Sequence, residues 1–108
     1  MRSDTEMVAA AYSAQDRGDL RGLASLVQQS QGVLRGRLLM VLAYEIALQT
    51  GDASKVKRLL DAAIRLMTDN YVWLRQSQKM RIAIWTAVRD RPLAQQIIRE
   101  RAAQGRHP

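Results

Sequence analysis

Apolar side chains recur along this chain at spacings of three and four residues, the pattern of helices with one buried face. Gly-Asp pairs at 18–19 and 51–52 have the residue types that end one helix and begin the next. Asp90, followed closely by Pro92, also has the residue types that begin a helix. Weaker signals for the end of a helix fall at 29–32 and 68–70. The pattern predicts an all-α protein of about six helices, near residues 4–17, 20–29, 33–50, 53–68, 71–89 and 92–104.

The three helices that follow Asp19, Asp52 and Asp90 share one apolar stripe. Apolar residues stand four, seven and eight positions after each aspartate: Leu23, Leu26 and Val27; Val56, Leu59 and Leu60; Ala94, Ile97 and Ile98. This repetition predicts three antiparallel helical hairpins, each with an acidic residue at the turn and the same buried face. An open stack and a closed, compact helical bundle would both bury these stripes, so the pattern leaves both architectures open.

The spacing of the aspartates, 33 residues from 19 to 52 and 38 from 52 to 90, is typical of repeats built from paired helices. Residues 33–100 resemble the tetratricopeptide repeat. The residues that carry this resemblance are Ala53, Leu60, Ala63, Ala94 and Ile98. The chain departs from the repeat pattern at Tyr44, Ala47 and Val56. The resemblance implies a stack of helical hairpins, and such stacks form concave surfaces that bind partners.

The segment 33–48 is apolar on nearly every side, with Arg35, Arg37 and Glu45 as its only charged residues. A helix of this kind is buried all round, so it either forms the middle of a compact bundle or has one face covered by a partner. In a stack of three hairpins, the first helix of the middle hairpin is the natural position for it. A buried carboxylate needs a partner or water. Glu45 therefore either lines a pocket and binds an arginine of another molecule, or is solvated or paired with an arginine of this chain. We favour the second interpretation.

The 108 residues are predicted to form a single domain over 1–104, followed by a short tail at 105–108. The chain has no cysteine, no glycine-rich phosphate loop, and a single histidine, His107, in that tail. We therefore predict no catalytic, cofactor-binding or metal-binding residue and no enzymatic activity. The longest apolar stretch, 38–48, is too short to cross a membrane, and the absence of cysteine fits a reducing compartment. A cytoplasmic protein is predicted.

The net charge of +7 favours acidic or phosphate-rich partners. Arginine outnumbers lysine by 14 to 3, and arginine serves protein interfaces as well as phosphates. The candidate contacts for phosphate or an acidic partner are Lys55, Arg58, Arg65, Arg75, Lys79, Arg81 and Arg99. The alternative is that these residues form ordinary solvated helix faces.

Aromatic residues next to arginines are typical of protein interfaces. The candidate partner-binding residues are Tyr12, Tyr44, Glu45, Trp73 and Trp85. The small apolar residues of the first helix also predict a contact with a second copy or with another chain. The predicted function is a protein–protein interaction module, a small adaptor, chaperone or assembly subunit. The alternative is a basic helical subunit that binds nucleic-acid backbone within a larger complex.

Overall fold

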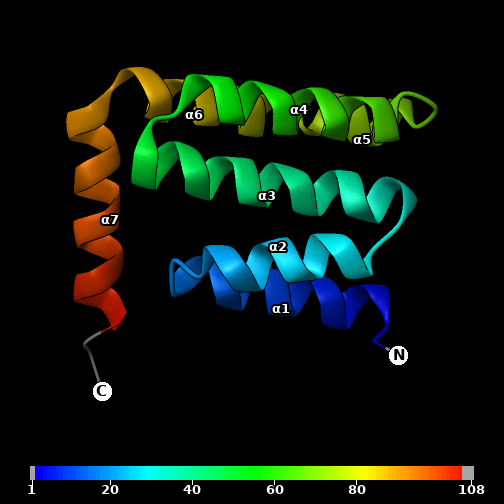
Figure 1. Cartoon of the computed structure of the whole chain (residues 1–108), viewed down its shortest axis with the longest axis horizontal. Coiled ribbons are helices and arrows are strands. Elements are labelled where there is room, and N and C mark those ends of the chain that lie inside the picture. The colour runs from blue at the N-terminus through cyan, green and yellow to red at the C-terminus, as the bar shows by residue number, and fades with distance from the viewer. Residues whose placement is uncertain (1, 106–108) are drawn as a thin grey trace.

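The computed structural model describes residues 2–105, and all regular structure within that range is helical. Helices α1 (Asp4–Asp16) and α2 (Leu20–Gln29) form one antiparallel pair, and α3 (Gly32–Thr50) and α4 (Ala53–Met67) form the next (Figure 1). Helices α5 (Tyr71–Gln76) and α6 (Gln78–Arg89) follow almost end to end, and α7 (Arg91–Gly105) completes the fold. The predicted all-α class is confirmed.

The aspartates that were expected to begin helices all cap one. The Oδ1 atom of Asp19 accepts the Gly22 backbone N–H at 2.8 Å, and Asp52 and Asp90 accept equivalent N–H groups at 3.1 Å. Each bond satisfies a donor in the first turn that has no partner within the helix. The caps explain why α2, α4 and α7 begin within one residue of their predicted starts.

The segment expected to be one helix from 71 to 89 is divided at Ser77. The Ser77 hydroxyl donates to the Leu74 carbonyl at 2.6 Å, and Arg81 Nη2 donates to the same oxygen at 3.3 Å. A serine hydroxyl that bonds a nearby carbonyl competes with the backbone N–H groups of a regular helix. The short helix that results, α5, contains no buried residue.

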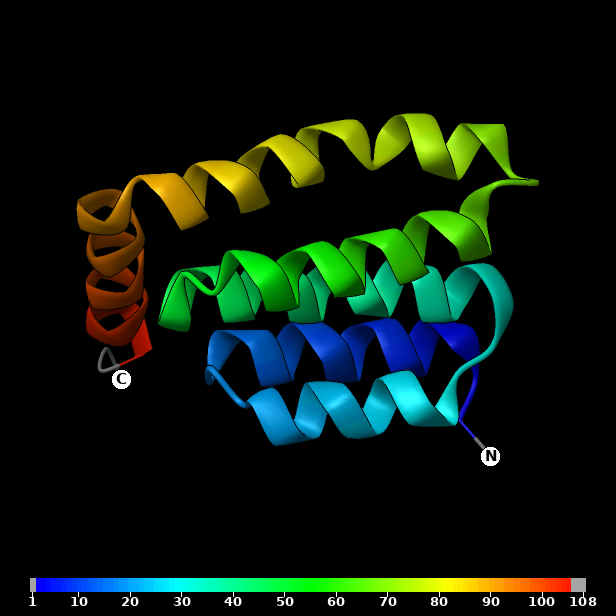
Figure 2. The same cartoon turned by 45° about the horizontal axis from the view of Figure 1, so that its top comes forward.

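Helix α3 lies at the centre of the fold and contacts α1, α2, α4, α6 and α7. In Figure 2, α4 lies in front of it, the α1–α2 pair below it and α5–α6 above it. Eleven of its 19 residues are buried, as expected for a helix that is apolar on nearly every side. The apolar core is therefore continuous through α3 rather than divided among separate hairpins.

Helix α7 does not fold back along α6 to complete a third hairpin. It runs instead across the ends of the other helices, from the α6 layer to the α1 layer (Figure 1). A single residue, Asp90, separates α6 from α7, and the Arg91 guanidinium donates to the carbonyls of Ala47, Leu48 and Ala87 at 2.6–2.9 Å. Arg91 thus binds the C-terminal ends of both α3 and α6 and holds the chain at this corner.

Gly51, which ends α3, is required at the same corner. Its φ of 66° lies in the left-handed region, and a Cβ atom there would lie 3.0 Å from the Arg91 guanidinium. A larger residue would therefore be strained and would also displace Arg91.

Candidate functional site

An apolar groove of about 220 Å³ opens between α1, α3 and the α5–α6 helices. Its lining includes Val8, Ala11 and Tyr12 from α1, Leu38 and Val41 from α3, and Trp73 and Met80 from α5–α6. We call this surface the Tyr12–Trp73 groove. It is formed by α1 and the α5–α6 helices on a floor supplied by the central helix α3, and Met67 of α4 also lines it.

The helical spacing of the lining residues explains how the groove forms. On α1, Val8, Ala11 and Tyr12 lie three and four residues apart and so share one face. Trp73 and Met80 belong to one face that continues through Ser77, the residue that divides α5 from α6. Further along the same face Ile84 is fully buried, so the groove side chains continue directly into the core.

Arg37 is the one charged residue that lines this groove within residues 2–105. Its guanidinium carbon lies 4.0 Å from the centroid of the Trp73 ring, a cation–π arrangement that orients both side chains. None of the ion pairs and side-chain hydrogen bonds found in the described part of the chain involves Arg37. The groove therefore combines an apolar floor, a half-exposed tyrosine and a cation that has no ion-pair partner among residues 2–105.

The candidate partner-binding residues lie in different environments. Tyr12 is 50% exposed and lies in the Tyr12–Trp73 groove together with Trp73. Tyr44 is half-buried against the core, and Trp85 lies in a second surface groove, between α4 and α6, with Ile64 and Ile82. The structure therefore brings Tyr12 and Trp73 together and separates them from Trp85.

Glu45 is completely buried, so it offers no surface to a partner in this structure. Its Oε1 atom forms an ion pair with Arg101 Nη1 at 2.6 Å, and its Oε2 atom accepts from Gln49 Nε2 at 2.8 Å. Of the two interpretations of this residue, pairing with an arginine of the same chain is the one observed. Arg101 Nη1 also donates to the Gln15 carbonyl at 2.9 Å, so the pair connects α7 to both α3 and α1.

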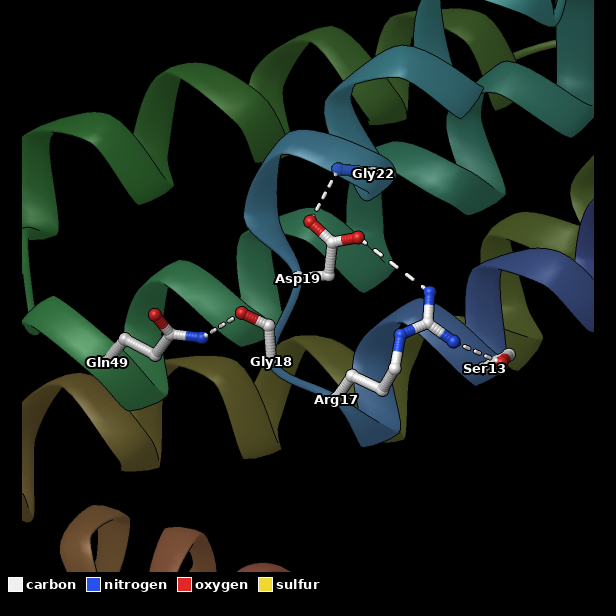
Figure 3. A network of polar contacts seen from close by, with 6 residues as sticks. All are labelled: Ser13, Arg17, Gly18, Asp19, Gly22 and Gln49. Atoms are coloured by element: carbon white, nitrogen blue, oxygen red, sulfur yellow. Dashed lines mark hydrogen bonds and ion pairs between the residues drawn. The ribbon is translucent and has the colours of Figure 1, made fainter.

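The turn between α1 and α2 is attached to α3 through Gln49, the residue that also donates to Glu45. Gln49 Nε2 donates to the Gly18 carbonyl at 3.0 Å (Figure 3). Gly18 has a φ of 66°, and a Cβ atom there would lie 3.1 Å from Gln49 Nε2. On the other side of the turn, Arg17 donates to Ser13 at 2.6 Å and pairs with the capping Asp19 at 3.7 Å. The polar contacts in this region are therefore structural.

The arginines divide into structural and exposed groups. Arg35, Arg91 and Arg101 donate to carbonyls near helix C-termini, which accounts for part of the arginine excess. Among the predicted phosphate contacts, half-buried Arg81 also donates to a carbonyl. The remaining six are exposed and belong to no ion pair within residues 2–105: Lys55, Arg58, Arg65, Arg75, Lys79 and Arg99.

Sequence reasoning did not single out Arg37 as a site residue. The available signal was a charged residue between apolar neighbours in the helix expected to be buried. Its partner Trp73 is 36 residues away in the sequence, and only the packing of α3 against α5–α6 brings the two together.

No group of three or more histidine, aspartate and glutamate side chains within residues 2–105 could hold a metal ion. His107 and most of the predicted tail lie outside the described residues. In the described range, no helix has both the length and the apolar character needed to cross a membrane. Comparison of the chain with protein-family models, curated proteins and solved structures finds no match.

Proposed function

We propose that this chain is a protein–protein interaction module, an adaptor, chaperone or assembly subunit without enzymatic activity. It uses a tetratricopeptide-like arrangement of helices to bind a partner segment in the Tyr12–Trp73 groove. The observation that carries this proposal is the groove itself, an apolar surface between α1 and the α5–α6 helices with aromatic side chains at its walls. Tyrosine and tryptophan in such positions supply large contact areas at protein interfaces.

The size of the groove favours side chains of a partner segment over a cofactor or metabolite. Pockets that enclose small molecules usually measure roughly 300–1,000 Å³. The Tyr12–Trp73 groove, at about 220 Å³, has room for one or two apolar side chains. A partner would therefore insert anchor residues here and lay the rest of its segment along α1 and α5–α6.

Peptides selected from a random display library against the intact chain are expected to bind this groove. Replacing Trp73 by alanine should weaken their binding by about tenfold or more, because an aromatic anchor at the centre of an interface carries much of the binding free energy. Tyr12→Ala should also weaken binding, and Tyr12 is exposed enough for that variant to remain folded. Titration followed by fluorescence anisotropy measures both effects.

Trp85→Ala is the matched control, since Trp85 is a half-buried tryptophan of the second groove. Circular dichroism should first establish that all three variants are folded. The proposal predicts that peptide affinity stays within about twofold of the wild type in Trp85→Ala. Equal losses in the Trp73 and Trp85 variants, or no loss in either, would contradict a binding site at the Tyr12–Trp73 groove.

Nucleic-acid binding is a second candidate, because five exposed cations lie on the neighbouring helices α4, α5 and α6: Lys55, Arg58, Arg65, Arg75 and Lys79. They are spread over solvated faces, and no cation–π contact joins any of them to an aromatic ring within residues 2–105. We therefore expect only weak, non-specific binding to a single-stranded DNA oligonucleotide, with a Kd of about 10⁻⁴ M at physiological salt. A titration at about 50 and about 200 mM salt measures this. Submicromolar binding that falls steeply with salt would instead establish the second candidate.

A further inference from the structure

Arg37 differs from the other arginines that are partly buried in this fold. The guanidinium groups of Arg35, Arg81, Arg91 and Arg101 all donate to backbone carbonyls. Arg37 is also half-buried, yet it has no acceptor and no carboxylate partner among residues 2–105. It lies instead against the Trp73 ring, in the lining of an apolar groove.

This position prepares the guanidinium to bind an anion. Stacking on Trp73 restricts the long side chain, so less conformational entropy is lost when a ligand binds. The faces of the guanidinium suit stacking, whereas its N–H groups point along its edges and can donate two parallel hydrogen bonds to a carboxylate. Apolar neighbours such as Val41 and Met80 reduce solvent screening, which strengthens such an ion pair.

We propose that the partner segment carries a carboxylate beside a large apolar side chain, and that Arg37 binds this carboxylate. This inference rests on the function proposed for the groove. The apolar side chain occupies the floor next to Leu38 and Val41, and the carboxylate reaches the Arg37 guanidinium at the Trp73 wall. Either an aspartate or glutamate side chain or the C-terminal carboxylate of a segment can supply the charge.

The charges on the molecule favour an acidic segment over two other possible occupants of the groove, a second copy of this chain and a nucleic acid. No acidic residue in the range 2–105 lines the groove, and the chain carries a net charge of +7. A second copy of this chain would bring the same positive charge and would be repelled at long range. A nucleic acid needs several cations along its backbone, whereas the described residues present only one in this groove.

Synthetic peptides test the inference without knowledge of the natural partner. Three amidated peptides share one uncharged sequence that contains no tryptophan and has a single apolar anchor residue, leucine or methionine. They differ only in the residue next to this anchor, which is glutamate, glutamine or lysine. A fourth has the anchor at its end with a free C-terminal carboxylate. Binding to the intact chain is followed by Trp73 fluorescence in a Trp85→Phe background, which removes the second tryptophan of the described structure.

The glutamate peptide is expected to bind about tenfold more tightly than the glutamine peptide, with the lysine peptide weakest. Arg37→Gln should remove this preference, so that the affinities of this variant for the glutamate and glutamine peptides lie within about twofold of each other. Arg37→Lys keeps the charge and should retain part of the preference. Arg75→Gln is the matched control, because it removes one exposed positive charge from α5 and should leave the preference intact.

The outcomes separate this inference from the function on which it rests. Equal affinity for the glutamate and glutamine peptides, or a preference that survives Arg37→Gln, would overturn the role of Arg37 while the groove remains a peptide-binding site. If none of the four peptides binds, the proposed function fails as well. Displacement of the glutamate peptide by a single-stranded oligonucleotide would overturn the inference in favour of phosphate binding. The fourth peptide distinguishes a terminal carboxylate from a side chain.

Discussion

Replacing Arg101 by methionine is expected to lower the free energy of unfolding by about 3 kcal/mol. Glu45 is fully buried, and Arg101 Nη1 lies 2.6 Å from its Oε1 atom. Without Arg101 the carboxylate keeps only the hydrogen bond from Gln49, and a buried charge left without its counterion is strongly destabilising. Urea denaturation followed by circular dichroism measures the loss.

Adding Glu45→Met to the Arg101→Met variant should restore much of the lost stability. A buried ion pair replaced at both positions by apolar side chains of similar volume is often neutral or stabilising. Single, double and wild-type chains together form a double-mutant cycle, which isolates the interaction between the two residues. A double variant less stable than Arg101→Met alone would show that the desolvated charge is not the origin of the effect.

The exposed ion pair between Lys57 and Asp61 is the control, since its 2.8 Å contact is similar in length. Both side chains are more than half exposed, so water screens the pair and side-chain entropy opposes it. Lys57→Met should change the stability by at most about 0.5 kcal/mol. A similar loss of stability in Lys57→Met and Arg101→Met would contradict the argument that burial determines how destabilising the loss of an ion pair is.

Replacing Arg91 by methionine is expected to cost about 2–3 kcal/mol. The guanidinium donates to the carbonyls of Ala47, Leu48 and Ala87, and the Ala47 carbonyl also accepts the Gly51 backbone N–H at 3.1 Å. The variant leaves these acceptors without their charged donor at the C-terminal ends of two helices. Thermal and urea denaturation both report the change.

Arg89→Met is the matched control for Arg91→Met. Arg89 lies two residues earlier and is exposed, and the variant removes the same charge. Its effect should be within about 0.5 kcal/mol of zero. Hydrogen exchange adds a local test, because loss of Arg91 should increase exchange in the first turn of α7 more than in α1. Similar losses in the two variants would show that net charge, rather than the contacts of Arg91, determines the stability.

The elements of this fold could be predicted because their signals are local. Each aspartate cap involves an N–H group three residues away. Each apolar stripe can be recognised from residues within a single helix. The direction of α7 could not be predicted in this way. The stripe that contains Ala94 shows which face of α7 is buried, whereas its path depends on contacts of Arg91 with α3, more than 40 residues earlier in the sequence.

The candidate site could be predicted only in pieces. Tyr12 and Trp73 were singled out by residue type, and nothing local showed that they share a groove or that Trp85 lies in another. The arginine that pairs with Glu45 could not be chosen from the sequence either, because 56 residues separate Glu45 from Arg101. Side chains that meet across helices require the packing of those helices, which the spacing of apolar residues alone does not determine.

Helix α5, which carries the Trp73 wall of the Tyr12–Trp73 groove, contains no buried residue, so it unfolds locally more easily than the α3 floor of the groove. Segments with few buried contacts open at low free energy, whereas a helix enclosed like α3 opens only when the whole domain unfolds. The Trp73 wall can therefore adjust to the shape of a bound segment, and the floor formed by α3 cannot. Binding would order the backbone of α5 at an entropic cost, while the stacked Arg37 and Trp73 side chains keep their arrangement, so the amides of α5 should show the largest gain in hydrogen-exchange protection when a peptide is bound.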